Sequence, residues 1–123
     1  MNKVSILVLG CSLILTSVGV SANSCAIALP KVDALITNVN LVLASDDIDA
    51  ISEMSSELKD KARDILKASD NCGCDDAYES TESMLDNIND AYLSDTAKEA
   101  KEYLLELKAN VQATIKHLNQ CDL

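Results

Sequence analysis

The feature that most constrains this chain is an internal repeat with a period of 49 residues. A shift by that period aligns Cys25 with Cys74 and Cys72 with Cys121. The 48 aligned positions contain 12 identities, against roughly 4 expected by chance for this composition. The matches include an Asn-x-Asn pair, a Ser-Asp pair and a Glu-Leu-Lys triplet. The chain is therefore predicted to contain two copies of one unit, residues 25–72 and 74–121.

Each copy is predicted to form a helical hairpin. Apolar side chains in the second half of each copy recur in alternating steps of three and four, which is typical of a helix with one face in a core. In the second copy this stripe comprises Ala97, Ala100, Leu104, Leu107, Val111, Thr114 and Leu118. Its counterpart in the first copy comprises Ile48, Ile51, Ser55, Leu58, Ala62, Ile65 and Ser69. The preceding helices carry Val32, Leu35, Ile36, Val39 and Leu43, and Ala77, Met84, Leu85, Ile88, Ala91 and Tyr92.

The turns of the two hairpins are expected near residues 44–45 and 93–94. Ser45 and Ser94 are predicted to cap the helices that follow, with the next aspartate at the positive end of each helix dipole. Pro30 suits a first helical turn, where its missing N–H costs nothing, so residues 25–29 are expected to be extended.

The predicted fold class is all-α, an up-down four-helix bundle made of two tandem disulfide-stapled helical hairpins. Residues 23–123 contain a single glycine, a single proline, and neither Phe nor Trp. Tight turns with positive φ are therefore scarce, which disfavours β-hairpins and sheet. We expect one helical domain over residues 23–123.

The N-terminus has the features of a secretory signal peptide. Lys3 precedes an apolar run from Val4 to Val20, and small residues lead to a cleavage site after Ala22. The alternatives are an uncleaved membrane anchor and a lipoprotein acylated at Cys11. We expect residues 1–22 to be removed, leaving a secreted or periplasmic protein that does not insert stably into a membrane.

The four cysteines that remain after cleavage are predicted to form two disulfides. The repeat favours Cys25–Cys72 with Cys74–Cys121, each closing the open end of one hairpin. The crossed pairing, Cys25–Cys74 with Cys72–Cys121, would join the hairpins, and a third pairing would need a strained Cys72–Cys74 ring. A less favoured hypothesis treats the Cys72-Gly73-Cys74 segment as a redox centre or metal clip, although its acidic neighbours disfavour a thiolate.

Catalytic, cofactor and metal sites are not expected. His117 is the single histidine, which excludes a histidine pair, and it lies at the edge of an apolar stripe. A single glycine in residues 23–123 excludes a glycine-rich phosphate loop. After cleavage 9 basic residues face 20 acidic ones, a net charge of −11, which disfavours binding to nucleic acid or an anionic membrane.

One stretch of the sequence is more acidic than a surface that only contacts solvent would require. Eight acidic residues and no basic residue lie between Lys67 and Lys98. Five of them fall on one side of the predicted third helix and are called the acidic face below: Asp75, Glu79, Glu82, Asp86 and Asp90. Only Asp33 is acidic at the matching positions of the first copy, so the hairpin fold does not require this charge.

These observations predict a small exported, non-enzymatic binding or inhibitory module, of the inhibitor or immunity type, whose acidic face engages a basic protein or peptide. One alternative is a face that only keeps the chain soluble. Others are low-affinity divalent-cation buffering in the cell envelope and, less favoured, thiol chemistry at Cys72-Gly73-Cys74.

Overall fold

The computed structural model describes residues 24–122, which form helices joined by short links and contain no strand. In chain order they are the 3-10 helix η1 (Cys25–Ala28), then α1 (Leu29–Leu43), α2 (Ile48–Asn71), α3 (Asp75–Tyr92) and α4 (Ala97–Cys121). The predicted signal peptide, residues 1–22, lies outside the described residues. The prediction of an all-helical chain is confirmed for the described part.

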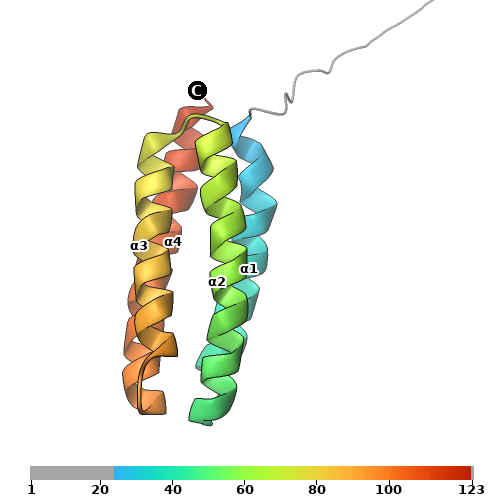
Figure 1. Cartoon of the computed structure of the whole chain (residues 1–123). Coiled ribbons are helices and arrows are strands. Elements are labelled where there is room, and N and C mark those ends of the chain that lie inside the picture. The colour runs from blue at the N-terminus through green and yellow to red at the C-terminus, as the bar shows by residue number, and fades with distance from the viewer. Residues whose placement is uncertain (1–23, 123) are drawn as a thin grey trace, which may run out of the picture.

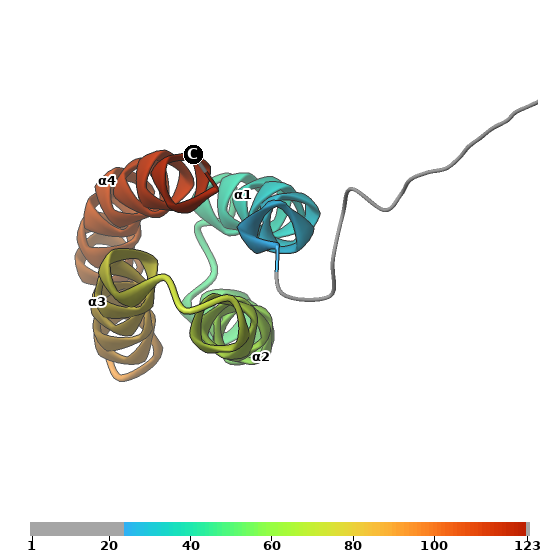
Figure 2. The same cartoon turned by 90° about the horizontal axis from the view of Figure 1, so that it is seen from above.

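The four long helices lie side by side as a helical bundle (Figure 1). Viewed along their length, α1 lies beside α2 and α4, and α3 completes the ring between α2 and α4 (Figure 2). The link from α2 to α3 lies at the same end of the bundle as η1 and the C-terminus, whereas the link from α3 to α4 lies at the opposite end (Figure 1).

The core repeats with the same period as the sequence. Every buried residue of the first copy has a buried counterpart 49 positions later. The first copy buries Cys25, Ala28, Val32, Leu35, Val39, Val42, Ile51, Ser55, Leu58, Ala62, Ile65 and Ser69. The second buries Cys74, Ala77, Thr81, Met84, Ile88, Ala91, Ala100, Leu104, Leu107, Val111, Thr114 and Leu118. The two copies therefore use the same helix faces, although most of the paired residues differ.

Several positions depart from the predicted stripes. Ala28 and Val42 are buried although the prediction omitted them. Five predicted members are only partly buried: Ile36, Leu43, Ile48, Leu85 and Ala97. Tyr92 was expected in the core but is 41% exposed, with the Lys59 ammonium 4.9 Å from the centre of its ring. Thr81, absent from the predicted stripe, is fully buried, and its hydroxyl donates to the carbonyl oxygen of Ala77 at 2.7 Å. That local hydrogen bond lets a polar side chain occupy a core position.

The predicted turns are confirmed but the predicted helix caps are wrong by two residues. The links cover residues 44–47 and 93–96, so the last link residue of each becomes the cap. Asp47 accepts from the N–H of Asp49 at 3.0 Å, and Thr96 accepts from the N–H of Glu99 at 3.1 Å. Both caps have extended backbone angles, as capping requires. Ser94 instead donates its hydroxyl to a carbonyl of α3.

The start of the first copy is helical, not extended as expected. The Ser24 hydroxyl accepts from the N–H of Ala26 at 3.2 Å, which satisfies a free donor and allows the tight turn of η1 to form. Leu29 then begins α1, and Pro30 occupies its first turn as predicted.

The stretch Cys25–Leu43 is long and apolar enough, by length and composition alone, to cross a membrane. A core helix of a bundle passes the same test, and four α1 residues are buried against the other helices: Val32, Leu35, Val39 and Val42. Its outer side remains exposed, with Leu41 at 60%.

Candidate functional site

The acidic face occupies the outer side of α3. All five of its residues are exposed, and the opposite side of the helix is buried in the core through Ala77, Thr81, Met84, Ile88 and Ala91. Asp75 and its neighbour Asp76 lie in the first turn, where the positive end of the helix favours negative charge. The structure thus places the predicted residues on one solvent-facing side, as the helical spacing requires.

The carboxylates of the acidic face have no cationic partner within residues 24–122. The ion pairs in this part of the chain are Arg63–Asp60 at 3.6 Å and Lys101–Asp46 at 2.6 Å. The hydrogen bond from Lys101 lowers the pKa of Asp46, with the charge of Lys101 acting in the same direction. Neither of these ion pairs involves a residue of the acidic face.

Two cations of α2 border the acidic face without pairing with it. Lys59 and Arg63 line a shallow hollow of about 230 Å³ together with Leu85, Asp86 and Asn89. Each cation already has a partner of its own, because Lys59 lies over the ring of Tyr92 and Arg63 contacts Asp60. Lys59 and Arg63 therefore mark the boundary of the acidic face on the side of Asp86 that lies toward α2.

The matching surface of the first copy has a different chemistry at the same exposure. The positions equivalent to the acidic face are all exposed: Ala26, Pro30, Asp33, Thr37 and Leu41. Asp33 is the only charged residue among these five. Because both copies bury the same set of positions, packing does not dictate what stands on this outer side. The row of five carboxylates is found in the second copy alone.

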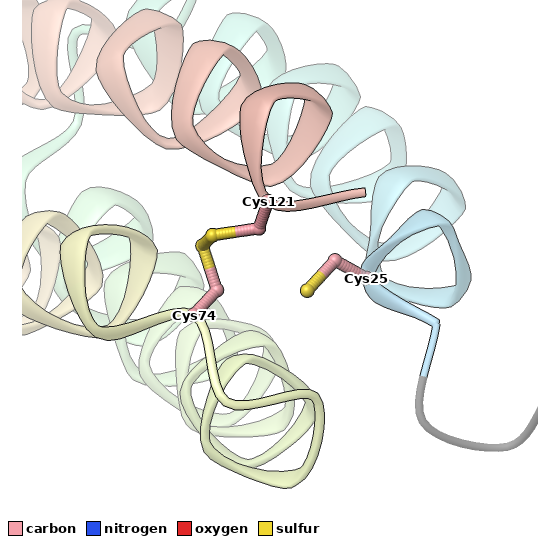
Figure 3. Close-up of side chains that lie close together, drawn as sticks. All are labelled: Cys25, Cys74 and Cys121. Atoms are coloured by element: carbon pink, nitrogen blue, oxygen red, sulfur yellow. A yellow bond between two sulfur atoms is a disulfide. The ribbon is translucent and has the colours of Figure 1, made fainter. Parts of the chain in front are cut away.

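The four cysteines meet at one end of the bundle. The disulfides are Cys25–Cys72 and Cys74–Cys121, the pairing that the repeat favoured, and each joins residues 47 positions apart. In the chain-entropy description, closing a loop of this length stabilises the fold by about 4 kcal/mol. Figure 3 shows that Cys25 also faces the other disulfide, and the Sγ atoms of Cys25, Cys74 and Cys121 all lie within 4.8 Å of one another.

The segment Cys72-Gly73-Cys74 is explained by the junction between α2 and α3. The N–H of Gly73 donates to the carbonyl oxygen of Asp70, and the N–H of Cys74 donates to that of Ser69, both at 3.0 Å. This is the Schellman arrangement that ends a helix, and it requires positive φ at the central residue, here +73° at Gly73. The two cysteines bond to distant partners and do not form a dithiol pair with each other.

Asp122 joins the two ends of the described chain, a contact that the sequence analysis missed. Its carboxylate accepts from the N–H of Cys25 at 2.9 Å and from the hydroxyl of Ser24 at 3.2 Å. The sequence gives one sign of this contact, an acidic residue directly after the last cysteine. Acidic residues are too common for that position to predict a partner 97 residues away.

A basic hollow between α1 and α2 was also missed. It measures about 300 Å³ and carries Lys31 and Lys67 at its edge, with Asp64 as its acidic residue. The lysines are far apart in sequence, so only the packing of α1 on α2 brings them together.

The remaining candidate ligands do not converge. Within residues 24–122, the one group of three potential metal-ligating side chains whose ligand atoms approach within 4.8 Å consists of Cys25, Cys74 and Cys121. The carboxylates of the acidic face form no such group. His117 is half-buried, as expected at the edge of a stripe, and its Nδ1 has no hydrogen-bond partner in this part of the chain.

The chain matches no protein-family model, no curated protein and no solved structure.

Proposed function

We propose that the protein is a small exported, non-enzymatic binding or inhibitory module that engages a basic protein or peptide through the acidic face of α3. The observation that carries the proposal is the contrast between the copies. At equivalent exposed positions one copy has five carboxylates that form no ion pair within residues 24–122, whereas the other has mainly apolar or neutral side chains. Like charges spaced three and four residues apart repel one another, so a neutral or mixed surface would stabilise α3 better.

The architecture assigned to this module is an up-down bundle of two tandem hairpins, each stapled at its open end. Contacts between successive helices and between α1 and α4 support this order, as do the two disulfides. Stapled, rigid helices hold the carboxylates in a fixed row, which lowers the entropy lost on binding. The two disulfides are compatible with an oxidising compartment, and residues 1–22 supply the proposed export signal.

A charge-reversal experiment tests the acidic face directly. The variant Glu79→Lys/Glu82→Lys/Asp86→Lys is compared with Glu53→Lys/Glu57→Lys/Glu106→Lys, which changes the net charge equally at exposed positions of α2 and α4. The probe is a lysine-rich helical peptide, and binding is followed by fluorescence anisotropy at low and physiological salt. Each reversal removes an attraction and adds a repulsion, so the first variant should lose about 3 kcal/mol, roughly 100-fold in affinity.

The control variant should keep its affinity within a few-fold of the original protein. Equal losses in both variants would mean that net charge, and not the acidic face, attracts the peptide, and would contradict the proposal. The natural partner is then sought by mass spectrometry among exported proteins retained by the original protein and the control variant but lost by the first variant.

A further inference from the structure

The two disulfides are close enough for a thiolate released from one of them to attack the other. Three sulfur atoms from two different bonds converge: Cys25 belongs to the first disulfide, and Cys74 and Cys121 form the second. Their Sγ atoms all lie within 4.8 Å of one another (Figure 3). A thiolate released at any one of these atoms therefore has a bonded sulfur of the other disulfide within a short movement. Thiol–disulfide exchange requires this kind of approach.

The exposure of the four cysteine residues favours Cys121 as the first point of attack by an outside thiol. Cys121 is exposed and Cys72 is half-buried, whereas Cys25 and Cys74 are 2% and 1% exposed. An attack on Cys121 expels Cys74 as the leaving group. Cys74 is the N-cap of α3, so the positive end of that helix favours the negative charge that develops on its sulfur.

Other groups at this end oppose the reaction and make it slow. Asp75 and Asp76 follow Cys74 directly, and the Asp122 carboxylate holds the backbone N–H of Cys25. The Sγ of Cys74 also lies 3.4 Å from the carbonyl oxygen of His117, which favours a thiol over a thiolate. We therefore expect exchange on the slow side of the range for disulfide reshuffling, seconds to hours.

We propose that the cysteine end is a thiol–disulfide exchange site, in which a thiol that attacks Cys121 becomes attached there and the attack is passed through Cys74 to Cys25. The partner class is any molecule or protein that presents a thiolate small or exposed enough to reach Cys121. Cys121 is accordingly the modification site, and Cys72 is the thiol released at the end.

The reaction conserves atoms and electrons. The incoming thiolate forms a bond to Sγ of Cys121, the Cys74–Cys121 bond breaks, and its electron pair stays on Cys74. The Cys74 thiolate then bonds to Sγ of Cys25, the Cys25–Cys72 bond breaks, and Cys72 takes a proton from water. Two disulfides and one thiol enter, and two disulfides and one thiol leave, so no oxidant or reductant is consumed.

The product has a different connectivity from the starting bundle. Its Cys25–Cys74 bond joins the start of the first copy to the start of the second, and neither hairpin is closed at its open end. Attachment of a thiol at Cys121 thus converts two separately stapled hairpins into a cross-linked pair. The exchange reaction does not involve the acidic face, so its test is independent of the test of the proposed function.

The test treats the oxidised protein with glutathione, quenches with an alkylating agent and maps the cysteines by mass spectrometry. We expect glutathione on Cys121, an alkylated Cys72 and a Cys25–Cys74 linkage in the same molecules. Glutathione mainly on Cys72, or an alkylated Cys74 with an intact Cys25–Cys72 bond, would overturn the proposal. So would a chain that remains unmodified while an exposed peptide disulfide reacts completely.

A pair of matched variants removes the outside thiol from the experiment. Cys72→Ser leaves Cys25 as a free thiol within the sulfur cluster, whereas Cys25→Ser leaves Cys72 free and removes a member of the cluster. Both lose the same disulfide, and circular dichroism checks that they fold alike. Alkylation should label Cys121 at least about tenfold more in Cys72→Ser than in Cys25→Ser. Equal labelling of Cys121 would refute internal transfer; if neither variant folds, the glutathione experiment decides.

Discussion

Replacing Ser55 by alanine is expected to stabilise the protein, although it removes a polar group from a helix. The Ser55 side chain is fully buried, and its Oγ has no hydrogen-bond partner among the described residues. An unpaired buried hydroxyl costs about 1–3 kcal/mol, and alanine adds a few tenths of a kcal/mol of helix propensity. Local adjustment of the hydroxyl toward a helix carbonyl offsets part of the cost, so we expect a net gain of about 1 kcal/mol.

For a domain of this size that gain corresponds to a rise of about 4–8 °C in Tm, measured by far-UV circular dichroism on the oxidised protein. The matched control is Thr81→Val, which also removes a fully buried hydroxyl but one that donates to the Ala77 carbonyl at 2.7 Å. The control should be destabilised by up to about 1 kcal/mol. A lower Tm for Ser55→Ala, or changes of the same sign in both variants, would refute the reasoning.

Two further predictions concern the links. Gly73→Ala should lower the urea midpoint by an amount equivalent to about 1 kcal/mol, because φ is +73° while the added Cβ meets no atom within 4 Å; an unchanged midpoint would contradict the backbone argument. Lys101→Met should raise the pKa of Asp46 toward its ordinary value in a carboxyl NMR titration, since Lys101 lowers it in the original protein. Because the folded-state pKa is lowered, the contribution of this pair is present at neutral pH and disappears as the pH falls through that pKa, so the variant should lose this part of the acid sensitivity.

Much of the helical core could be predicted from spacing alone. The stripe from Ala100 to Leu118 and its counterpart from Ile51 to Ser69 are buried as the alternating steps of three and four indicated. The repeat predicts core positions for Ser55 and Ser69 in spite of their hydroxyls, because it aligns them with Leu104 and Leu118. The spacing of apolar residues along a helix is a local property, so it can be detected in the sequence without knowledge of the helices packed against it.

Predictions that depended on one or two residues were less secure. Ser45 and Asp47 are both good N-caps, and the choice between them depends on how many link residues the packing of α1 against α2 requires. Tyr92 has the right spacing for the core, but it lies in the last turn of α3, where its ring is partly exposed and meets Lys59. Boundaries between elements are set by tertiary contacts that spacing does not encode.

By itself, the sequence determined the duplication, the helix faces that are buried, the row of carboxylates on α3 and the favoured cysteine pairing. All of these follow from the chain's own periodicity and from the alignment of one copy with the other. Three contacts result from tertiary packing. Cys25 lies against the Cys74–Cys121 disulfide, Asp122 accepts a hydrogen bond from the first turn, and Lys31 and Lys67 line one hollow. Those neighbours come from different helices, and their distances depend on how side chains of many residues fill the space between helices, which no local pattern records.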